Sequence, residues 1–175
     1  MKILLVNDFW NGGGCEGVFR NTFDFLNKSP RFEVKLWYGE KDSIKPAEPV
    51  SYIYSRHRFW EMVKILSDFS PDIVHIHNYY HVLSPSVLHA VQQYKKLNPA
   101  CKLVVTAHDY HLIFPNAALN FFENGEYKIF NKCPAFSDIF FKKLDRRGWL
   151  YSFLKAGQWF FAYRVLQLRN AIDHV

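Results

Sequence analysis

The alternation of two patterns along the first 107 residues constrains this chain more than any other feature. Short apolar runs of strand length alternate with segments in which apolar residues recur at helical spacing. Such alternation predicts an α/β fold, a Rossmann-like, doubly wound parallel sheet with right-handed crossovers. We expect strands at residues 2–6, 32–38, 50–54, 73–76 and 102–106, and helices at residues 16–28, 59–69 and 85–96.

The pattern changes after residue 107. Residues 108–136 contain prolines and an Asn-Gly pair and predict one long loop at the edge of the sheet, where loops of this length are usually functional. Residues 137–144 and 149–169 are helix candidates within a basic, aromatic segment at 137–169. Residues 171–175 resemble the start of another strand, so we expect residues 1–175 to form one amino-terminal domain, cut partway through a larger fold.

Charge and cysteine content limit the classes of partner and compartment. No apolar run reaches the roughly 20 residues that span a bilayer. Asn7 and Asp8 interrupt the first apolar run too early for a signal peptide, so we expect a cytoplasmic protein. The three cysteines lie far apart and indicate neither a disulfide framework nor a zinc site. A net charge of +6 favours an anionic partner: a sugar nucleotide, an anionic lipid or a nucleic acid.

A glycine-rich loop follows the first strand, at the sheet edge where ligands bind in open α/β folds. It reads Gly12-Gly13-Gly14-Cys15-Glu16 and leads into a helix, whose first turn offers free N–H groups to a phosphate. The spacing matches neither the P-loop nor the dinucleotide fingerprint. We favour phosphate or sugar contact over a merely flexible turn.

Two further polar segments end strands at the same edge. His75 and His77 share one strand face; two such histidines can bind a metal, but no third ligand is evident. We interpret His75 as a packed strand residue, and His77 and Asn78 as candidates for ligand contact. His108, followed by Asp109 and Tyr110, can orient a sugar hydroxyl or transfer a proton, although a histidine that simply caps the strand is the alternative.

The excess of aromatic residues, 18% of the chain, is concentrated after Phe114. Cationic residues beside a helix rich in Trp, Phe and Tyr are typical of a helix that lies in a membrane interface. Packing of the aromatic residues against an absent half of the protein explains the pattern equally well. Nucleic-acid binding ranks lower, because no RNA- or DNA-binding motif is present. The candidate membrane-facing residues are Lys142, Lys143, Arg146, Arg147 and Trp149.

Taken together, these segments resemble the amino-terminal domain of glycosyltransferase family 4, which has the GT-B fold. The resemblance spans nearly the whole chain and depends on three motifs, of which each alone is weak. They are the glycine loop after the first strand, the run Pro-Asp-Ile-Val-His-Ile-His-Asn at 71–78, and Thr-Ala-His-Asp-Tyr at 106–110, where Ala107 is an insertion.

The resemblance implies a retaining transfer from a nucleotide-diphospho-sugar to a glycan or a lipid-linked acceptor, with no metal or other cofactor. In such enzymes the first domain holds most of the acceptor site and the second binds the nucleotide. By position, Gly13 and Gly14 would approach the donor diphosphate, and His108 would be the catalytic residue beside the transferred sugar. Candidates for the acceptor side are Glu16, His77, Asn78, Asp109 and Tyr110.

Two other functions remain open. The chain can be a non-catalytic, membrane-attached subunit that binds acceptor and needs a separate donor-binding partner. It can also be an ordinary nucleotide-binding Rossmann module, but the second strand ends in Leu36-Trp37-Tyr38-Gly39, with no acidic residue before Glu40 to hold a ribose. The basic, aromatic segment favours a role in cell-envelope polysaccharide synthesis, on the inner face of the membrane.

Overall fold

The computed structural model of the 175-residue chain describes residues 1–39 and 49–175. The polar, proline-containing segment 41–49, which the sequence predicts to be a loop, lies mostly outside the described residues. The chain divides into two compact units. The first comprises residues 1–108 and 167–175, and the second comprises residues 109–166. Each unit is described separately below.

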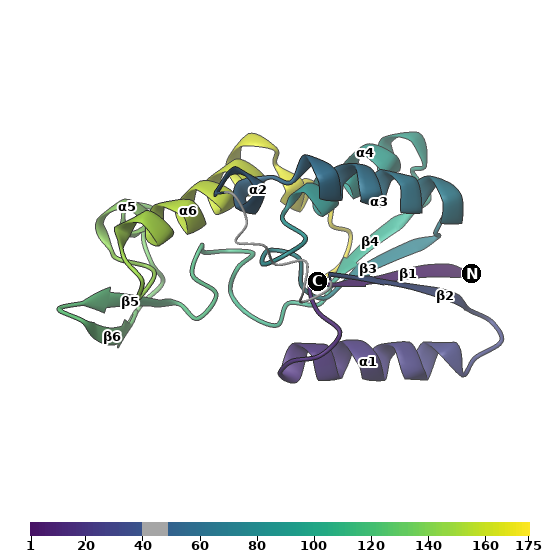
Figure 1. Cartoon of the computed structure of the whole chain (residues 1–175). Helices are drawn as coiled ribbons and strands as arrows, with labels where there is room; N and C mark the ends of the chain where they lie inside the picture. The colour runs from purple at the N-terminus through teal and green to yellow at the C-terminus, as the bar shows by residue number, and fades with distance from the viewer. Residues whose placement is uncertain (40–48) are drawn as a thin grey trace. The chain divides into compact units, whose positions relative to one another are not determined.

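A four-stranded parallel sheet forms the centre of the first unit (Figure 1), as the alternation of patterns predicts. The strand order is β2-β1-β3-β4. The chain therefore adds β2 on one side of β1 and then crosses back to add β3 and β4 on the other side. Ligands of open α/β sheets bind beside such a reversal, beyond the carboxyl ends of the strands. The strands are β1 (Lys2–Asn7), β2 (Glu33–Tyr38), β3 (Ile73–Ile76) and β4 (Lys102–Val105).

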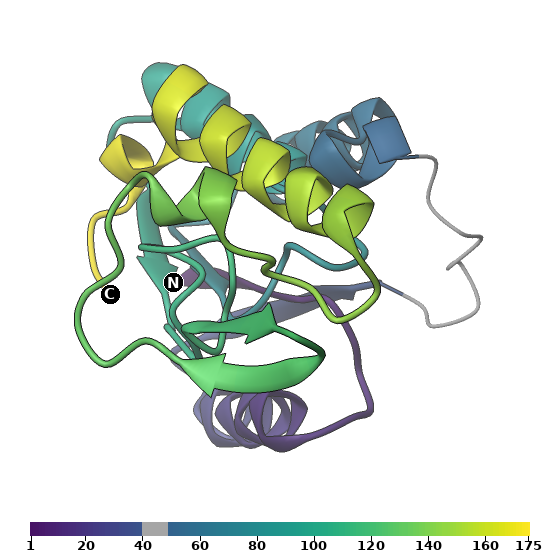
Figure 2. The same cartoon turned by 90° about the vertical axis from the view of Figure 1, so that its left-hand side faces the viewer.

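Helices cover both faces of this sheet (Figures 1 and 2). Helix α1 (Gly14–Asn27) lies on one face, and α3 (Arg56–Phe69) and α4 (Ser86–Leu97) lie together on the other. Alternate residues of β1 serve the two faces: Ile3 and Leu5 pack with Phe19 of α1, whereas Leu4 and Val6 turn to the opposite side. All four β1 side chains are almost fully buried, which explains the unbroken apolar run of this central strand.

Residues 50–54 form no strand, contrary to the sequence-based expectation. They belong mainly to a short helix, α2 (Pro49–Ile53), which begins with a proline, a residue suited to the first helical turn. Both edges of β1 are already paired, with β2 and β3. Tyr54 packs instead against Phe59 of α3 and His89 of α4, and its hydroxyl lies 2.9 Å from His89 Nδ1.

The last residues return to the sheet beside β4. His174 forms an isolated parallel bridge with Val104, where the sequence indicates the start of another strand. Asp173 fixes this position: its carboxylate accepts a hydrogen bond from the Leu103 N–H at 2.7 Å and pairs with Lys95 of α4.

The second unit contains a β-hairpin that the sequence analysis did not foresee. The segment 108–136, expected as one long loop, contains β5 (Asn120–Glu123) and β6 (Glu126–Ile129), paired in antiparallel fashion. Asn124 and Gly125 join the strands, with φ values of 53° and 82°. Two such left-handed residues make the tight turn that suits a hairpin.

The helical part of the second unit is more broken than expected. Helix α5 (Asp138–Phe141) covers only part of residues 137–144, and α6 (Trp149–Phe160) continues into a π-helical turn, η2 (Phe161–Val165). Gln167 then adopts a left-handed conformation (φ 52°) before a 3₁₀ turn, η3 (Leu168–Ala171), in the first unit. Within the described residues, no helix combines the length and apolarity needed to cross a bilayer.

The loop after β3 is tied to the end of β1 by one buried carboxylate. Asp8 is completely shielded from solvent and accepts backbone hydrogen bonds from His81, Val82 and Leu83 at 2.8–2.9 Å. Gly39, after β2, packs closely against the Asp8 backbone: a Cβ there would lie 2.7 Å from the Asp8 carbonyl oxygen. Asp8 therefore ties the end of β1 to the loop after β3, and the lack of a side chain at Gly39 lets the segment after β2 pass close beside it.

Replacement of Asp8 by alanine is expected to lower the free energy of unfolding by about 3 kcal/mol or more, because three buried N–H groups lose their acceptor. Asp8→Asn, which keeps one acceptor oxygen, is expected to lose less. Urea unfolding measures both values. The control Asp24→Ala, at an exposed position of α1, is expected to stay within about 0.5 kcal/mol of the original protein. Equal stability of the Asp8→Ala variant would contradict this role.

Candidate functional site

The three consecutive glycines at the start of α1 have different structural roles. Gly13 is the N-cap of α1 and Gly14 is its first residue. A Cβ added at Gly14 would meet nothing within 4 Å, and one at Gly13 would meet only the Glu16 carboxylate, at 3.9 Å. Gly12 is different, since a Cβ there would lie 2.8 Å from Glu16 Oε2. Of these three positions, only position 12 is crowded, since the Glu16 side chain would have to move to admit a Cβ there, and the backbone at 13 and 14 is open to approach.

Glu16 folds back over this loop instead of pointing into solvent. Its side chain is buried, and its Oε2 atom lies over Gly12 and Gly13 at the amino end of α1. A carboxylate is stabilised there by the helix dipole. The amino end of α1 thus combines backbone N–H donors, which suit a phosphate, with one acceptor group, which suits a sugar hydroxyl.

Three histidines come together on the α1 side of β3 and β4. The His75 and His77 rings lie 4.5 Å apart between centroids, and the His77 and His108 rings stack at 5.3 Å. His77 Nδ1 lies 3.1 Å from His108 Nε2, and His75 Nε2 lies 2.8 Å from Thr106 Oγ1. The structure therefore brings His77 and His108, predicted separately from two motifs, into direct contact.

Burial keeps the centre of this cluster uncharged. Desolvation, followed by the neighbouring histidines, lowers the pKa of His77 to about 3. The same two causes, burial and then His108, lower the pKa of His75. An uncharged imidazole carries its single proton on one of its two ring nitrogens.

The surroundings of His77 indicate which nitrogen holds that proton. His77 Nε2 is buried and has no hydrogen-bond partner among the described residues. A buried N–H without an acceptor is rarer and costlier than a buried acceptor without a donor. We infer that Nδ1 of His77 carries the proton and donates it to His108 Nε2. Neutral His108 then carries its own proton on Nδ1, which is available to a ligand.

Other predicted residues are distributed between the two units. Asn78 is buried, directly after His77, and its Oδ1 accepts a hydrogen bond from the Tyr79 N–H at 2.9 Å. Asp109 and Tyr110 belong to the second unit. There, Asp109 accepts the N–H of His111 at 2.8 Å, and the side chain of Tyr110 is exposed.

Asp8 and Gly39 were not predicted as site residues, although they fix this edge of the sheet. The sequence signal for Asp8 is its place immediately after a fully apolar strand, because an acidic residue buried there needs a specific set of donors.

Within residues 1–39 and 49–175, no group of three or more His, Cys, Asp and Glu side chains is arranged to hold a metal ion.

The low pKa of His77 predicts a loss of stability in acid. Above about pH 6.5 the folded and unfolded states both hold neutral His77, but below it only the unfolded state gains the proton readily. The free energy of unfolding, measured with urea, falls between pH 7 and pH 5. In His77→Phe this fall is expected to be about 2 kcal/mol smaller than in the original protein. His57→Phe, at an exposed histidine of α3, is the control and should leave the decrease unchanged. The same decrease in His77→Phe and the original protein would contradict the buried, neutral state.

Comparison with known proteins identifies the family. Residues 19–165 match the family described as the starch synthase catalytic domain, a group of GT-B glycosyltransferases. The match begins within α1 and includes β1's partners β2 and β3, the histidine cluster and nearly all of the second unit. No curated protein and no solved structure matches the chain significantly. The family match supports the wider GT-B class and not family 4 in particular. Because it covers most of the chain, this protein belongs to the glycosyltransferase family of the starch synthase catalytic domain.

Proposed function

We propose that this chain is the acceptor-binding half of a retaining glycosyltransferase of family 4 type. The enzyme moves a sugar from a nucleotide-diphospho-sugar to a glycan or a lipid-linked acceptor in cell-envelope polysaccharide synthesis, without a metal ion. The nucleotide is bound by a second domain, so residues 1–175 alone are inactive. The observation that carries this proposal is the position of the His77–His108 pair at the carboxyl edge of the sheet that also holds the open glycine loop.

The open backbone at Gly13 and Gly14 supports a role for this loop beside the donor. During transfer, the bond between the anomeric carbon and the diphosphate oxygen breaks as the bond to the acceptor oxygen forms on the same face. The acceptor hydroxyl proton passes to the departing diphosphate. Backbone N–H groups at the start of α1 stabilise the negative charge that develops on that leaving group. A side chain at either glycine would stand in this path.

His108 acts on the transferred sugar. With its Nε2 engaged by His77, it presents the Nδ1–H as a hydrogen-bond donor to a sugar hydroxyl. The ring also helps to shield the oxocarbenium-like centre from water. His77 is the positioning residue, since its hydrogen bond fixes both the orientation and the tautomer of His108. In the first unit, Glu16 and Asn78 supply polar groups for the acceptor. Asp109 and Tyr110 are the candidate acceptor-binding residues of the second unit.

The exposed face of α6 supports contact with the inner surface of the cell membrane. Leu150 and Phe153 are 67% and 54% exposed, and Trp149 at the start of the helix is 48% exposed. Lys143 and Arg146 precede this face. Apolar side chains beside cations suit an anionic lipid surface, on which a lipid-linked acceptor would be presented. Of the other two predicted cations, Lys142 is paired with Glu123 and Arg147 with Asp145, so they contribute less.

A non-catalytic subunit with the same membrane contact is the second candidate function, and the same α6 surface favours it. In this case His108 has no catalytic role, and the donor is bound by a separate partner protein. Loss of transfer on replacement of His108 separates the two.

In the complete enzyme, His108→Ala is expected to reduce the transfer rate by about 100-fold or more, because one donor to the reacting sugar is lost. The thermal unfolding midpoint is expected to fall modestly, because the buried His77 Nδ1–H loses its acceptor, but the variant should remain folded at the assay temperature. Sugar transfer from labelled donor measures the first quantity and calorimetry the second. His81→Ala, at an exposed histidine near the same edge, is the control and should transfer normally. Unchanged turnover in His108→Ala would remove this residue from the mechanism and favour the non-catalytic subunit.

Co-sedimentation with vesicles tests the membrane contact. At low salt the chain is expected to sediment with vesicles that contain anionic lipid, and added salt should release it. The double variant Leu150→Ser, Phe153→Ser is expected to stay in the supernatant. Trp60→Ser removes a tryptophan that is 65% exposed on α3 and should sediment as the original protein does. Absence of binding by the original protein at low salt would contradict the contact.

A further inference from the structure

The second unit has a polar pocket of about 350 Å³ that no proposed step uses. It lies where the β5–β6 hairpin, the segment before α6 and α6 itself meet. All its lining residues belong to this unit. They are Asn116, Asn120, Phe122, Leu144, Asp145, Arg146, Arg147 and Lys155.

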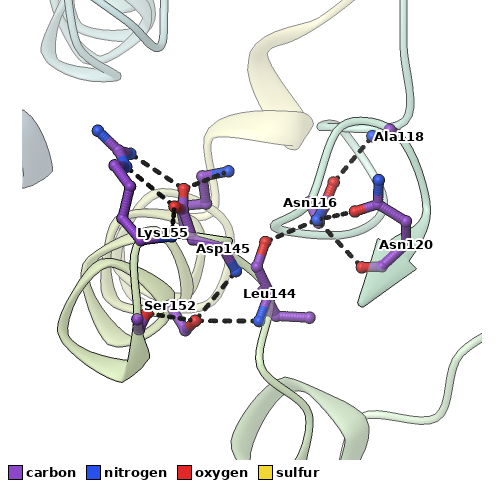
Figure 3. Close-up of polar contacts among 9 residues, drawn as sticks. Asn116, Ala118, Asn120, Leu144, Asp145, Ser152 and Lys155 are labelled. Carbon is purple, nitrogen blue, oxygen red and sulfur yellow. Dashed lines mark hydrogen bonds and ion pairs between the residues drawn. The ribbon is translucent and has the colours of Figure 1, made fainter. Parts of the chain in front are cut away.

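A network of hydrogen bonds makes one wall of this pocket rigid (Figure 3). Asn116 is buried and its side-chain amide donates to the Leu144 carbonyl at 2.7 Å and to the side-chain oxygen of Asn120. Its own oxygen accepts the Ala118 N–H at 3.0 Å. Ser152 of α6 receives the N–H groups of Leu144 and Asp145 at 3.0 and 3.1 Å. The segment before α6 is thus fixed to both the loop before β5 and the helix.

Asp145 organises the opposite wall (Figure 3). Its oxygens accept the Arg147 backbone N–H, two nitrogens of the Arg147 guanidinium and Lys155 Nζ, all at 2.9–3.0 Å. Burial alone would raise the pKa of this carboxyl, but the bonds from Arg147 and Lys155 outweigh it and hold the pKa of Asp145 well below its usual range. Asp145 is therefore ionised and saturated with donors.

Two lining side chains, Arg146 and Asn120, keep donors that no other described residue uses. Three cationic side chains against the single Asp145 carboxylate leave two positive charges. Arg146 is exposed and makes no hydrogen bond or ion pair with any described residue. Asn120 is 5% exposed; its oxygen faces Asn116, and its NH₂ group has no hydrogen bond in the described parts of the chain.

The geometry points to a binding site for a phosphoryl group in this pocket, held by Arg146, Asn120 and the free N–H groups of Lys155. A phosphate monoester carries nearly two negative charges at neutral pH and offers three acceptor oxygens, which matches the two surplus charges and the donor-only lining. A neutral sugar needs acceptors as well as donors, but the oxygens of Asp145 are already occupied. A carboxylate would neutralise only one of the two charges.

The identity of the molecule that carries the phosphoryl group rests on the proposed function. It would be a lipid-linked acceptor or a soluble phosphate ester. Binding itself does not require sugar transfer. A test of binding can therefore fail or succeed independently of the transferase proposal.

Nuclear magnetic resonance titration of the 175-residue chain with inorganic phosphate, at constant ionic strength, tests the site. The amide signals of Arg146 and the side-chain NH₂ of Asn120 are expected to shift and to saturate. Arg146→Ala is expected to weaken binding about tenfold, equivalent to about 1.4 kcal/mol. Arg31→Ala removes the same charge from an exposed position of the first unit and should have no effect.

Asn120→Asp is the sharper variant, because it keeps the oxygen that Asn116 needs and replaces the donor group with a negative charge. Binding of phosphate should be lost while the unfolding temperature is retained. Asn131→Asp, an exposed position of the same unit, makes the same charge change outside the pocket and should bind normally. Equal titrations of Asn120→Asp and the original protein, or shifts that spread over the surface without saturation, would overturn the proposal.

Vesicles containing phosphatidic acid then distinguish the two sources. Weaker vesicle binding by Asn120→Asp than by Asn131→Asp supports a phosphoryl group carried on a lipid. Equal vesicle binding by the two variants, together with the loss of soluble phosphate binding in Asn120→Asp, supports a soluble ester.

Discussion

The carboxylate of Asp8 is the interaction on which the ligand-facing edge of this sheet depends. It lies at the end of β1, the strand with neighbours on both sides, and collects three backbone donors from the loop after β3. A carboxylate without solvent is costly to bury unless donors surround it, and here all three donors come from the loop after β3. The end of β1 and the residues after β3 are held at a common edge as a result.

At that edge, the protonation and orientation of the histidine cluster are fixed by the protein itself, without a ligand. His77 cannot readily take a proton, and its second nitrogen is enclosed, so its one hydrogen bond determines how His108 is presented. A neutral donor of fixed orientation reorganises little during a reaction, which is the property that electrostatic stabilisation of a transition state requires. The adjacent Glu16 and the open backbone at Gly13 give the same edge both an acceptor and a place for negative charge.

The sequence predicts the central sheet well and the peripheral elements poorly. Apolar runs with both faces buried, such as that of β1, leave few alternatives to a central strand. Residues 50–54 resemble a strand locally, but they mainly form helix α2, and Tyr54 packs against Phe59 of α3 and His89 of α4 instead of a strand. The hairpin within 108–136 has one local signal, the Asn124-Gly125 pair, which by itself indicates only a turn and not the strands on either side of it. For the site, separate motifs indicated His77 and His108, but their contact depends on the register of β3 beside β4, which no local pattern specifies. Likewise, the sequence indicates Arg147 as a surface cation but gives no sign that Asp145 binds it.

Nitrogen-15 magnetic resonance of the imidazole rings tests the central claim most directly, because it reports which ring nitrogen carries the proton. The account predicts that His77 is neutral at pH 6 with its proton on Nδ1, and that its Nε2 has the signal of a bare nitrogen. At neutral pH, His108 should then hold its proton on Nδ1. Protonation of His77 on Nε2, or a charged His77 at pH 6, would contradict the proposed presentation of His108 to the sugar.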